Sequence, residues 1–177
     1  QLHFLLNTRE LGIERHNVGA VVYCSENIPF KEIVSQIPEV SECLNGFHTP
    51  IPKMFYSIYR VKEWDGKVAD SEQYIELEDE TINQDYADFF GVEVLNGSML
   101  DEKDGKDMVV INEAAMKAFG WTQPIGKKMG KLGKQCIVKG VIKNISYNAP
   151  IHPVAPAMFH LPDSRDRGGI IFKVKEG

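Results

Sequence analysis

A stretch rich in glycine and lysine is the first place where this sequence offers chemistry. It runs from Gly126 to Lys134, GKKMGKLGK, and holds three glycines and four lysines, residue types that bind phosphate. A Walker A loop has the pattern G-x-x-x-x-G-K-[ST], but here Gly130 comes one position too early and no Ser or Thr follows. A dinucleotide-binding loop leads into a helix, whereas a strand is expected after this stretch. The stretch is therefore predicted to be a solvated hairpin or loop, and no cofactor is predicted.

The histidines are the next candidates, because imidazole is a common ligand of zinc. The HExxH spacing of a zinc helix is absent, and two of the histidines flank prolines in a predicted loop. A zinc site built from separated histidines is an alternative that no ligand spacing supports. The five histidines are His3, His16, His48, His152 and His160.

Acidic and nucleophilic side chains complete the search for chemistry. The acidic segment Glu76–Glu80, ELEDE, lacks the glycine and the terminal glutamate of an EF-hand loop, and it is predicted to be a solvated strand end. Ser98 lies in the turn sequence NGSM, outside any GxSxG elbow. No catalytic, cofactor-binding or metal-binding residue is predicted, and the chain is expected not to be an enzyme.

The cysteines indicate structural thiols. Cys24, Cys43 and Cys136 form no CxxC pair, which argues against a zinc ribbon or a thioredoxin-type site. Cys43 and Cys136 lie in apolar stretches, where a free cysteine acts as a small hydrophobic residue. We expect them to be buried and unreactive.

Composition limits the class of protein. The 177 residues are 43% hydrophobic and 25% charged, which is typical of a folded globular chain. The net charge of −5 argues against nucleic acid as a partner and against docking on an anionic membrane surface. No run of about 20 apolar residues, the length that crosses a bilayer, is present. The chain has no signal peptide and begins with Gln1, so it is interpreted as an excised piece or a processed product.

Hydrophobic patterning predicts many short strands and few helices, and therefore an α+β architecture. A helix is expected within 28–40, with an apolar stripe of Phe30, Ile33, Val34 and Ile37. Two more are expected at 83–91 and 113–119. The sequence WDG at 64–66 signals a tight turn. Strands are expected at 18–23, 40–47, 54–62, 74–77, 92–95, 108–111, 136–142, 157–161 and 170–174.

A set of residues around the third helix has predicted structural roles. Asn112 should cap the helix, Gly120 should allow a positive φ at its exit, and Pro124 should stiffen the following turn. Gly126 and Gly140 should permit close approach of backbones. With the glutamate that starts the helix, the full set is Asn112, Glu113, Gly120, Pro124, Gly126 and Gly140.

Three segments resemble the periplasmic core domain of MacB-like permeases, within the broader FtsX-like permease family. Val109–Met129 is similar to the family's strand, Asn-Glu helix start, Gly exit and Pro-Ile-Gly-Lys turn. Val138–Phe159 resembles its Gly-Val strand, polar loop and Pro before the next strand. Asp85–Leu100 resembles its helix–Gly–strand unit. The opening segment, Gln1–Gly12, looks like the stretch after the first transmembrane helix in Bacteroidetes-type members.

The resemblance implies a domain of an ABC-transporter permease in the inner membrane, exposed to the periplasm. It implies a cytosolic ATPase as partner, reached through transmembrane helices outside this sequence, and a second permease copy in a homodimer. A periplasmic adaptor or a substrate protein is a further expected partner. The domain would couple ATP-driven helix motion to the handling of substrate or partner protein, by mechanical transmission.

We expect the whole of residues 1–177 to form this extracytoplasmic domain, as two small mixed α/β lobes. One lobe should hold residues 14–80 plus 169–177, and the other, residues 81–168, should be inserted into it. Both ends of the chain should then lie close together and face the membrane. A secreted or periplasmic hydrolase and a free-standing ligand-binding protein are the alternatives.

Overall fold

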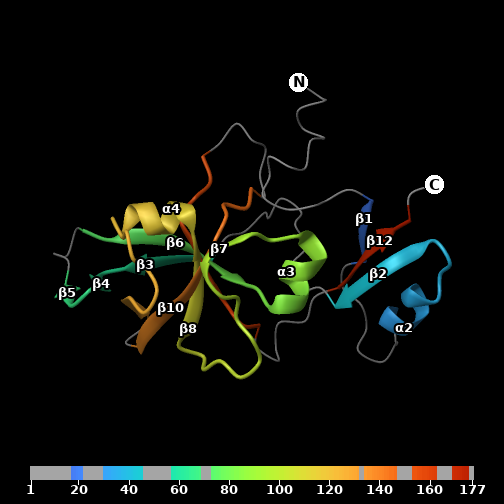
Figure 1. Cartoon of the computed structure of the whole chain (residues 1–177), viewed down its shortest axis with the longest axis horizontal. Helices are drawn as coiled ribbons and strands as arrows, with labels where there is room; N and C mark the ends of the chain where they lie inside the picture. The colour runs from blue at the N-terminus through green and yellow to red at the C-terminus, as the bar shows by residue number, and fades with distance from the viewer. Residues whose placement is uncertain are drawn as a thin grey trace.

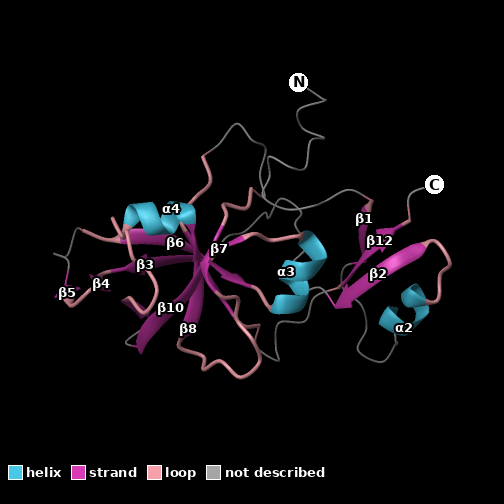
Figure 2. Ribbon diagram, viewed as in Figure 1, coloured by secondary structure: helices cyan, strands magenta, loops and turns pink. Residues whose placement is uncertain are grey.

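The computed structural model describes residues 17–21, 30–45, 57–68, 73–131, 134–146, 153–162 and 169–175. These residues form two β-sheets and three short helices (Figures 1 and 2). The architecture is α+β, which confirms the fold class expected from the sequence.

The small sheet brings together the beginning and the end of the described chain. Its order is β1 (Val18–Val21), β12 (Ile170–Val174) and β2 (Val40–Asn45), and both pairings are antiparallel. The register places Val18 opposite Lys173. Strands that are far apart in the sequence therefore hold each other in place.

Helix α2 (Phe30–Ser35) packs against β2 of the small sheet. It buries Val34, but Ile33 and Ile37 are 50% and 43% exposed. Only part of the predicted apolar stripe of this helix therefore faces the sheet.

The large sheet has nine strands, in the order β3-β6-β11-β8-β10-β9-β4-β5, with β7 also paired to β10. The long strand β10 is central, as the sequence predicted, because it pairs with β7, β8 and β9. The strands are β3 (Ile58–Val61), β4 (Glu63–Trp64), β5 (Lys67–Val68), β6 (Ile75–Thr81), β7 (Val94–Gly97), β8 (Met108–Asn112), β9 (Lys128–Lys131), β10 (Lys134–Ile142) and β11 (Ala157–His160).

A single residue separates two strands that lie in different parts of the large sheet. Strands β3 and β4 are separated only by Lys62, yet β3 pairs with β6 and β4 pairs with β9 near opposite ends of the strand order. The twisted sheet therefore brings β3 into contact with β9. A buried cluster that includes Val61, Leu77 and Met158 fills one face, which helix α4 (Glu113–Ala118) covers with Ala115.

Helix α3 (Gln84–Phe90) lies between the two sheets (Figure 1). The side chain of Asn83 accepts a hydrogen bond from the Tyr86 amide, and Gly91 ends the helix with a φ of 62°. Both features follow from the local sequence, because asparagine caps helices and glycine tolerates a left-handed exit.

Sheet membership divides the chain at a different place from the expected lobe boundary. The expected first lobe, 14–80 plus 169–177, includes residues 57–80, but β3 and β6 pair within the large sheet. The reason is the parallel pairing of β6 with β11, which no local pattern reveals. The large sheet is inserted in the sequence between β2 and β12. The division into two lobes as separate folding units stays a prediction.

One other local expectation is corrected by the structure. Glu76–Glu80 is the body of β6 instead of a solvated strand end, and Glu80 is buried. Pairing with β3 and β11 extends this strand beyond its apolar residues. His160 is the last residue of β11, inside the strand expected at 157–161 and directly before the loop that holds Pro162. The Gly126–Lys134 stretch forms much of the β9–β10 hairpin, as expected.

Candidate functional site

The described residues contain no cluster of three or more His, Cys, Asp or Glu side chains that could hold a metal ion. His160 faces Asp79, with Nε2 3.4 Å from Oδ1, and its Nδ1 lies 2.9 Å from the carbonyl oxygen of Leu161. Cys136 is buried as expected, whereas Cys43 is half-buried. Burial raises the pKa of the Cys43 thiol, which disfavours the reactive thiolate. His3, His16, His48, His152 and Cys24 lie outside the described residues.

Asn112 forms a polar node at the start of α4. Its side-chain oxygen accepts hydrogen bonds from the amide of Ala115 at 2.9 Å and from the amide of Ala157 at 3.0 Å. Its side-chain nitrogen donates to the carbonyl oxygen of Ala155 at 2.8 Å. The helix cap predicted from the sequence is therefore present. The same side chain also fixes the beginning of β11.

Glu113 and Asn144 add a reciprocal pair at the same helix end. The side-chain oxygen of Asn144 accepts from the amide of Ala114 at 3.0 Å, and the Asn144 amide donates to Glu113 at 3.1 Å. A distant residue thus satisfies a helix amide that has no partner within the helix. The node ties the end of β10 and the start of β11 to α4.

The residues that follow α4 hold the β4–β5 hairpin. Gly120 leaves the helix with a φ of 67°, and the next residue, Trp121, donates from Nε1 to Asp65 Oδ2 at 2.7 Å. Lys127 pairs with the other carboxylate oxygen of Asp65 at 3.1 Å. Asp65 and Gly66 both have positive φ, as in a type I′ turn, which confirms the tight turn predicted there.

The turn after α4 places Lys127 for this contact. The Lys127 amide donates to the carbonyl of Pro124 at 3.0 Å, and the Gly126 amide donates to Val138 at 2.8 Å. Gly126 has a φ of 78°, and a Cβ there would meet nothing within 4 Å. The expectation that Gly126 permits a close backbone approach is therefore wrong. The position favours glycine because of its left-handed backbone.

Gly140 does permit a close approach. A Cβ at this position would lie 2.3 Å from the backbone oxygen of Ser98, which follows β7. No real side chain fits that distance. Gly140 thus lets the segment of β7 lie directly against the central strand.

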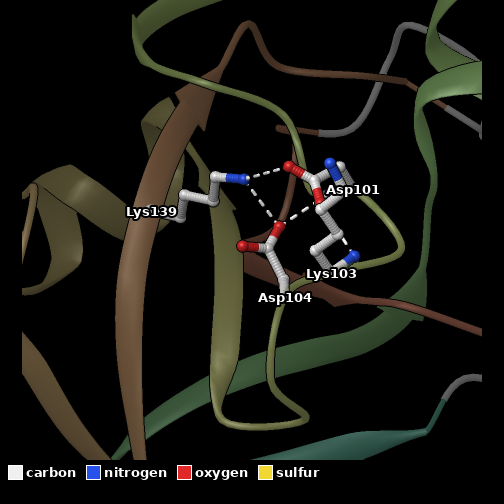
Figure 3. A network of polar contacts seen from close by, with 4 residues as sticks. All are labelled: Asp101, Lys103, Asp104 and Lys139. Atoms are coloured by element: carbon white, nitrogen blue, oxygen red, sulfur yellow. Dashed lines mark hydrogen bonds and ion pairs between the residues drawn. The ribbon is translucent and has the colours of Figure 1, made fainter.

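Lys139, the neighbour of Gly140 on β10, anchors the loop after β7 (Figure 3). Its Nζ lies 2.6 Å from Asp104 and 3.2 Å from Asp101. The hydrogen bond to Asp104 is the main reason that the pKa of Lys139 is raised. The pKa of Asp101 is lowered, first by the Lys103 amide that donates to it and then by Lys139. The network ties a charged loop to the sheet.

A cavity of about 380 Å³ lies beside the β4–β5 hairpin. Its lining mixes carboxylates, an ammonium group, an amide and apolar side chains, which favours no single class of ligand. The lining includes Glu63, Trp64, Asp65, Lys128, Met129 and Gln135.

The two ends of the described chain lie side by side at the small sheet. The amide of Val174 donates to the carbonyl of Asn17 at 2.9 Å. The Lys175 amide donates to Glu39 at 2.7 Å, and its Nζ donates to the carbonyl of Pro38 at 2.6 Å. The chain therefore enters and leaves the described structure at one place.

Comparison with known proteins identifies the fold. No family model matches the chain, and no curated protein matches it. A permease-protein domain from Porphyromonas gingivalis is 17% identical with a TM-score of 0.53, covering 82% of this chain and 66% of that one. The periplasmic region of MacB from Actinobacillus actinomycetemcomitans is 18% identical with a TM-score of 0.54, covering 98% and 80%. The extracellular domain of the noncanonic ABC-type transporter YknZ from Gram-positive bacteria is 14% identical with a TM-score of 0.52, covering 88% and 75%.

The chain has the fold of the MacB-like periplasmic domain of ABC-transporter permeases. At these identities the comparisons establish the fold. They agree with the family that the sequence resembled. Within the described part of the chain, no helix has the length and apolar run that a bilayer crossing needs.

In this MacB-like fold the structural residues singled out from the sequence do not all meet at one point. Asn112 and Glu113 build the node at the start of α4, whereas Gly120, Pro124 and Gly126 shape the support of the hairpin. Sequence reasoning missed their partners, Asn144 and Asp65 among them. The WDG turn was the only local signal for Asp65, and Asn144 had none.

Proposed function

We propose that this chain is the extracytoplasmic domain of an ABC-transporter permease, and that it couples ATP-driven motion of transmembrane helices to the handling of a substrate or partner protein. The proposal rests on the MacB-like fold and on one geometric observation. That observation is the pairing of β1 with β12.

The pairing suits a domain that is inserted between two transmembrane helices. Asn17 and Lys175 both contact the small sheet at the same end of β12. Chain segments that continue from these residues start close together, so a membrane can hold both. A displacement of either segment then acts directly on the small sheet.

The proposed role requires no chemistry from the domain. Asn112 and Glu113 cap α4, and Gly120, Pro124 and Gly126 support a hairpin, so each has a structural task that follows from backbone geometry. We therefore propose that the domain works as a mechanical and binding element and not as an enzyme.

The proposed partners follow from the permease role. A cytosolic ATPase subunit would bind the membrane part of the protein, and a second permease copy would complete a homodimer. A periplasmic adaptor or substrate protein would meet the exposed domain. The proposed location is the inner membrane, with this domain in the periplasm.

A labelling experiment on the intact protein in cells tests the proposal. Cys24, Cys43 and Cys136 are first replaced, and Glu102→Cys then introduces a thiol on an exposed loop. A maleimide that does not cross the inner membrane should label this thiol in intact cells, and the labelled protein should sediment with membranes. The matched control is Val110→Cys, which is buried and should stay unlabelled in the folded protein.

Purification from detergent gives the second readout. The tagged protein should retain an ATPase subunit whose activity is measurable. Labelling only after lysis would refute the periplasmic location. Recovery of the chain in the soluble periplasmic fraction, without membrane helices, would support a free-standing binding protein or a hydrolase instead.

A further inference from the structure

The hydrophobic core that surrounds α3 extends from one sheet into the other. Phe89 and Phe90 of α3 belong to the same buried cluster as Ile171 of β12. Leu44 of β2 and Val18 of β1 pack against this cluster. The small sheet therefore has no separate core on this side, because its inner face is completed by α3.

The large sheet contributes to the same cluster. Val110 of β8, Ile142 of β10 and Phe159 of β11 are members, and each is almost completely buried. Figure 1 shows α3 between the two groups of strands. One continuous set of apolar contacts thus runs from β12, through α3, to the central strands of the large sheet.

A charged side chain marks the boundary between the two sheets. Lys173 of β12 places its Nζ 4.7 Å from the centre of the Phe89 ring, in a cation–π contact. The same Nζ pairs with Glu42 of β2 at 3.1 Å. Lys173 therefore links α3 to β12 and β2 of the small sheet.

We propose that α3 joins the two sheets into one cooperative unit, so that a displacement of β1 and β12 reaches the large sheet without a hinge between two lobes. The mechanical importance of this unit rests on the proposed function, but its cooperativity does not. Packed cores transmit strain, because their interiors have low compressibility. A shared core is therefore a stiff connection.

Hydrogen exchange of the 177-residue chain, followed by mass spectrometry, tests the inference. Leu77→Ala removes a side chain from the other core of the large sheet, on the face away from α3. In one cooperative unit the slowest amides of β12 open only with the large sheet. Exchange should then accelerate by the same factor, at least about tenfold, in β8 and in β12.

Three further variants keep the result interpretable. Leu77→Val is the milder form if Leu77→Ala does not fold, and it should give a smaller factor that is again equal in the two sheets. Val68→Ala changes an exposed residue and should leave exchange in both sheets unaltered. Phe89→Ala removes a ring from the shared core and its contact with Lys173, so in one cooperative unit it should accelerate exchange in both sheets by a common factor.

Faster exchange in β8 and β10 with unchanged exchange in β2 and β12 would overturn the inference, because it would show two independent lobes. The test is separate from that of the proposed function. If the labelling experiment fails but exchange accelerates by one common factor in both sheets, the shared core is supported and the transporter role is refuted. If the protein is a membrane-bound permease but exchange accelerates by unequal factors in the two sheets, the transporter role is supported and the shared core is refuted.

Discussion

The replacement Asn112→Ala removes three hydrogen bonds in one change. The side chain accepts from the amides of Ala115 and Ala157 and donates to the carbonyl of Ala155. Asn112 is 1% exposed, so water cannot easily replace the lost partners. A typical hydrogen bond adds about 1 kcal/mol, and a buried group left without its partner costs about 1–3 kcal/mol. We therefore expect the free energy of unfolding to fall by about 3–5 kcal/mol.

Urea denaturation followed by circular dichroism measures this loss. A slope of about 2 kcal/mol per M converts it into a decrease of about 1.5–2.5 M in the midpoint. The slope itself should not change, because the variant exposes the same surface when it unfolds. This loss would be a large part of a total stability of about 5–15 kcal/mol.

Asn83→Ala is the matched control. Asn83 also caps a helix, but within the described part of the chain its side chain accepts a single hydrogen bond, from the Tyr86 amide at 2.9 Å. Loss of a simple cap costs about 1 kcal/mol. The difference between the two variants measures what Asn112 contributes through β11. If both variants lost the same free energy, the node would be no more than a helix cap and the reasoning would fail.

The remaining predictions concern three other contacts. Gly140→Ala should lower the free energy of unfolding by about 2 kcal/mol or more in urea, because its Cβ would lie 2.3 Å from a backbone oxygen; a loss below about 0.5 kcal/mol would contradict that contact. Lys139→Met should make the melting temperature depend less strongly on pH in the acidic range. The folded pKa of Asp101 is lowered first by a backbone amide and then by Lys139, so its contribution is present above the unfolded pKa of about 4 and is lost as pH falls through the folded value. An unchanged pH profile would exclude this linkage. Trp121→Phe removes the hydrogen bond to Asp65 and should cost about 1–2 kcal/mol in urea, whereas no loss would mean that the hairpin does not depend on it.

Local features of the fold could be read from the sequence because their causes are local. Asn112 and Gly120 mark the start and exit of α4, and Asn83 with Gly91 does the same for α3. Most strands were found because apolar runs of suitable length precede turn residues. The α+β class followed from these elements.

The contacts of the candidate sites could not be predicted in this way, because they form between segments that are far apart in the chain. The strands that flank Lys62 belong to opposite ends of the large sheet, which no hydrophobic pattern could predict. Burial of Glu80 depends on the pairing of β6 with β11. The second role of Asn112 depends on Ala155 and Ala157, which are more than 40 positions away in the sequence.

By itself, the sequence determined where α3 and α4 start and stop, that Gly91 and Gly120 turn the backbone at their ends, and which known family the chain resembles. Each of these depends on residues within a turn or two of one another, or on a pattern of residues along the chain. Only the tertiary structure decided that α3 completes the core of both sheets and that β12 returns beside β1. Those outcomes come from burying apolar area between segments far apart in the chain, and that area exists only once the whole molecule has folded.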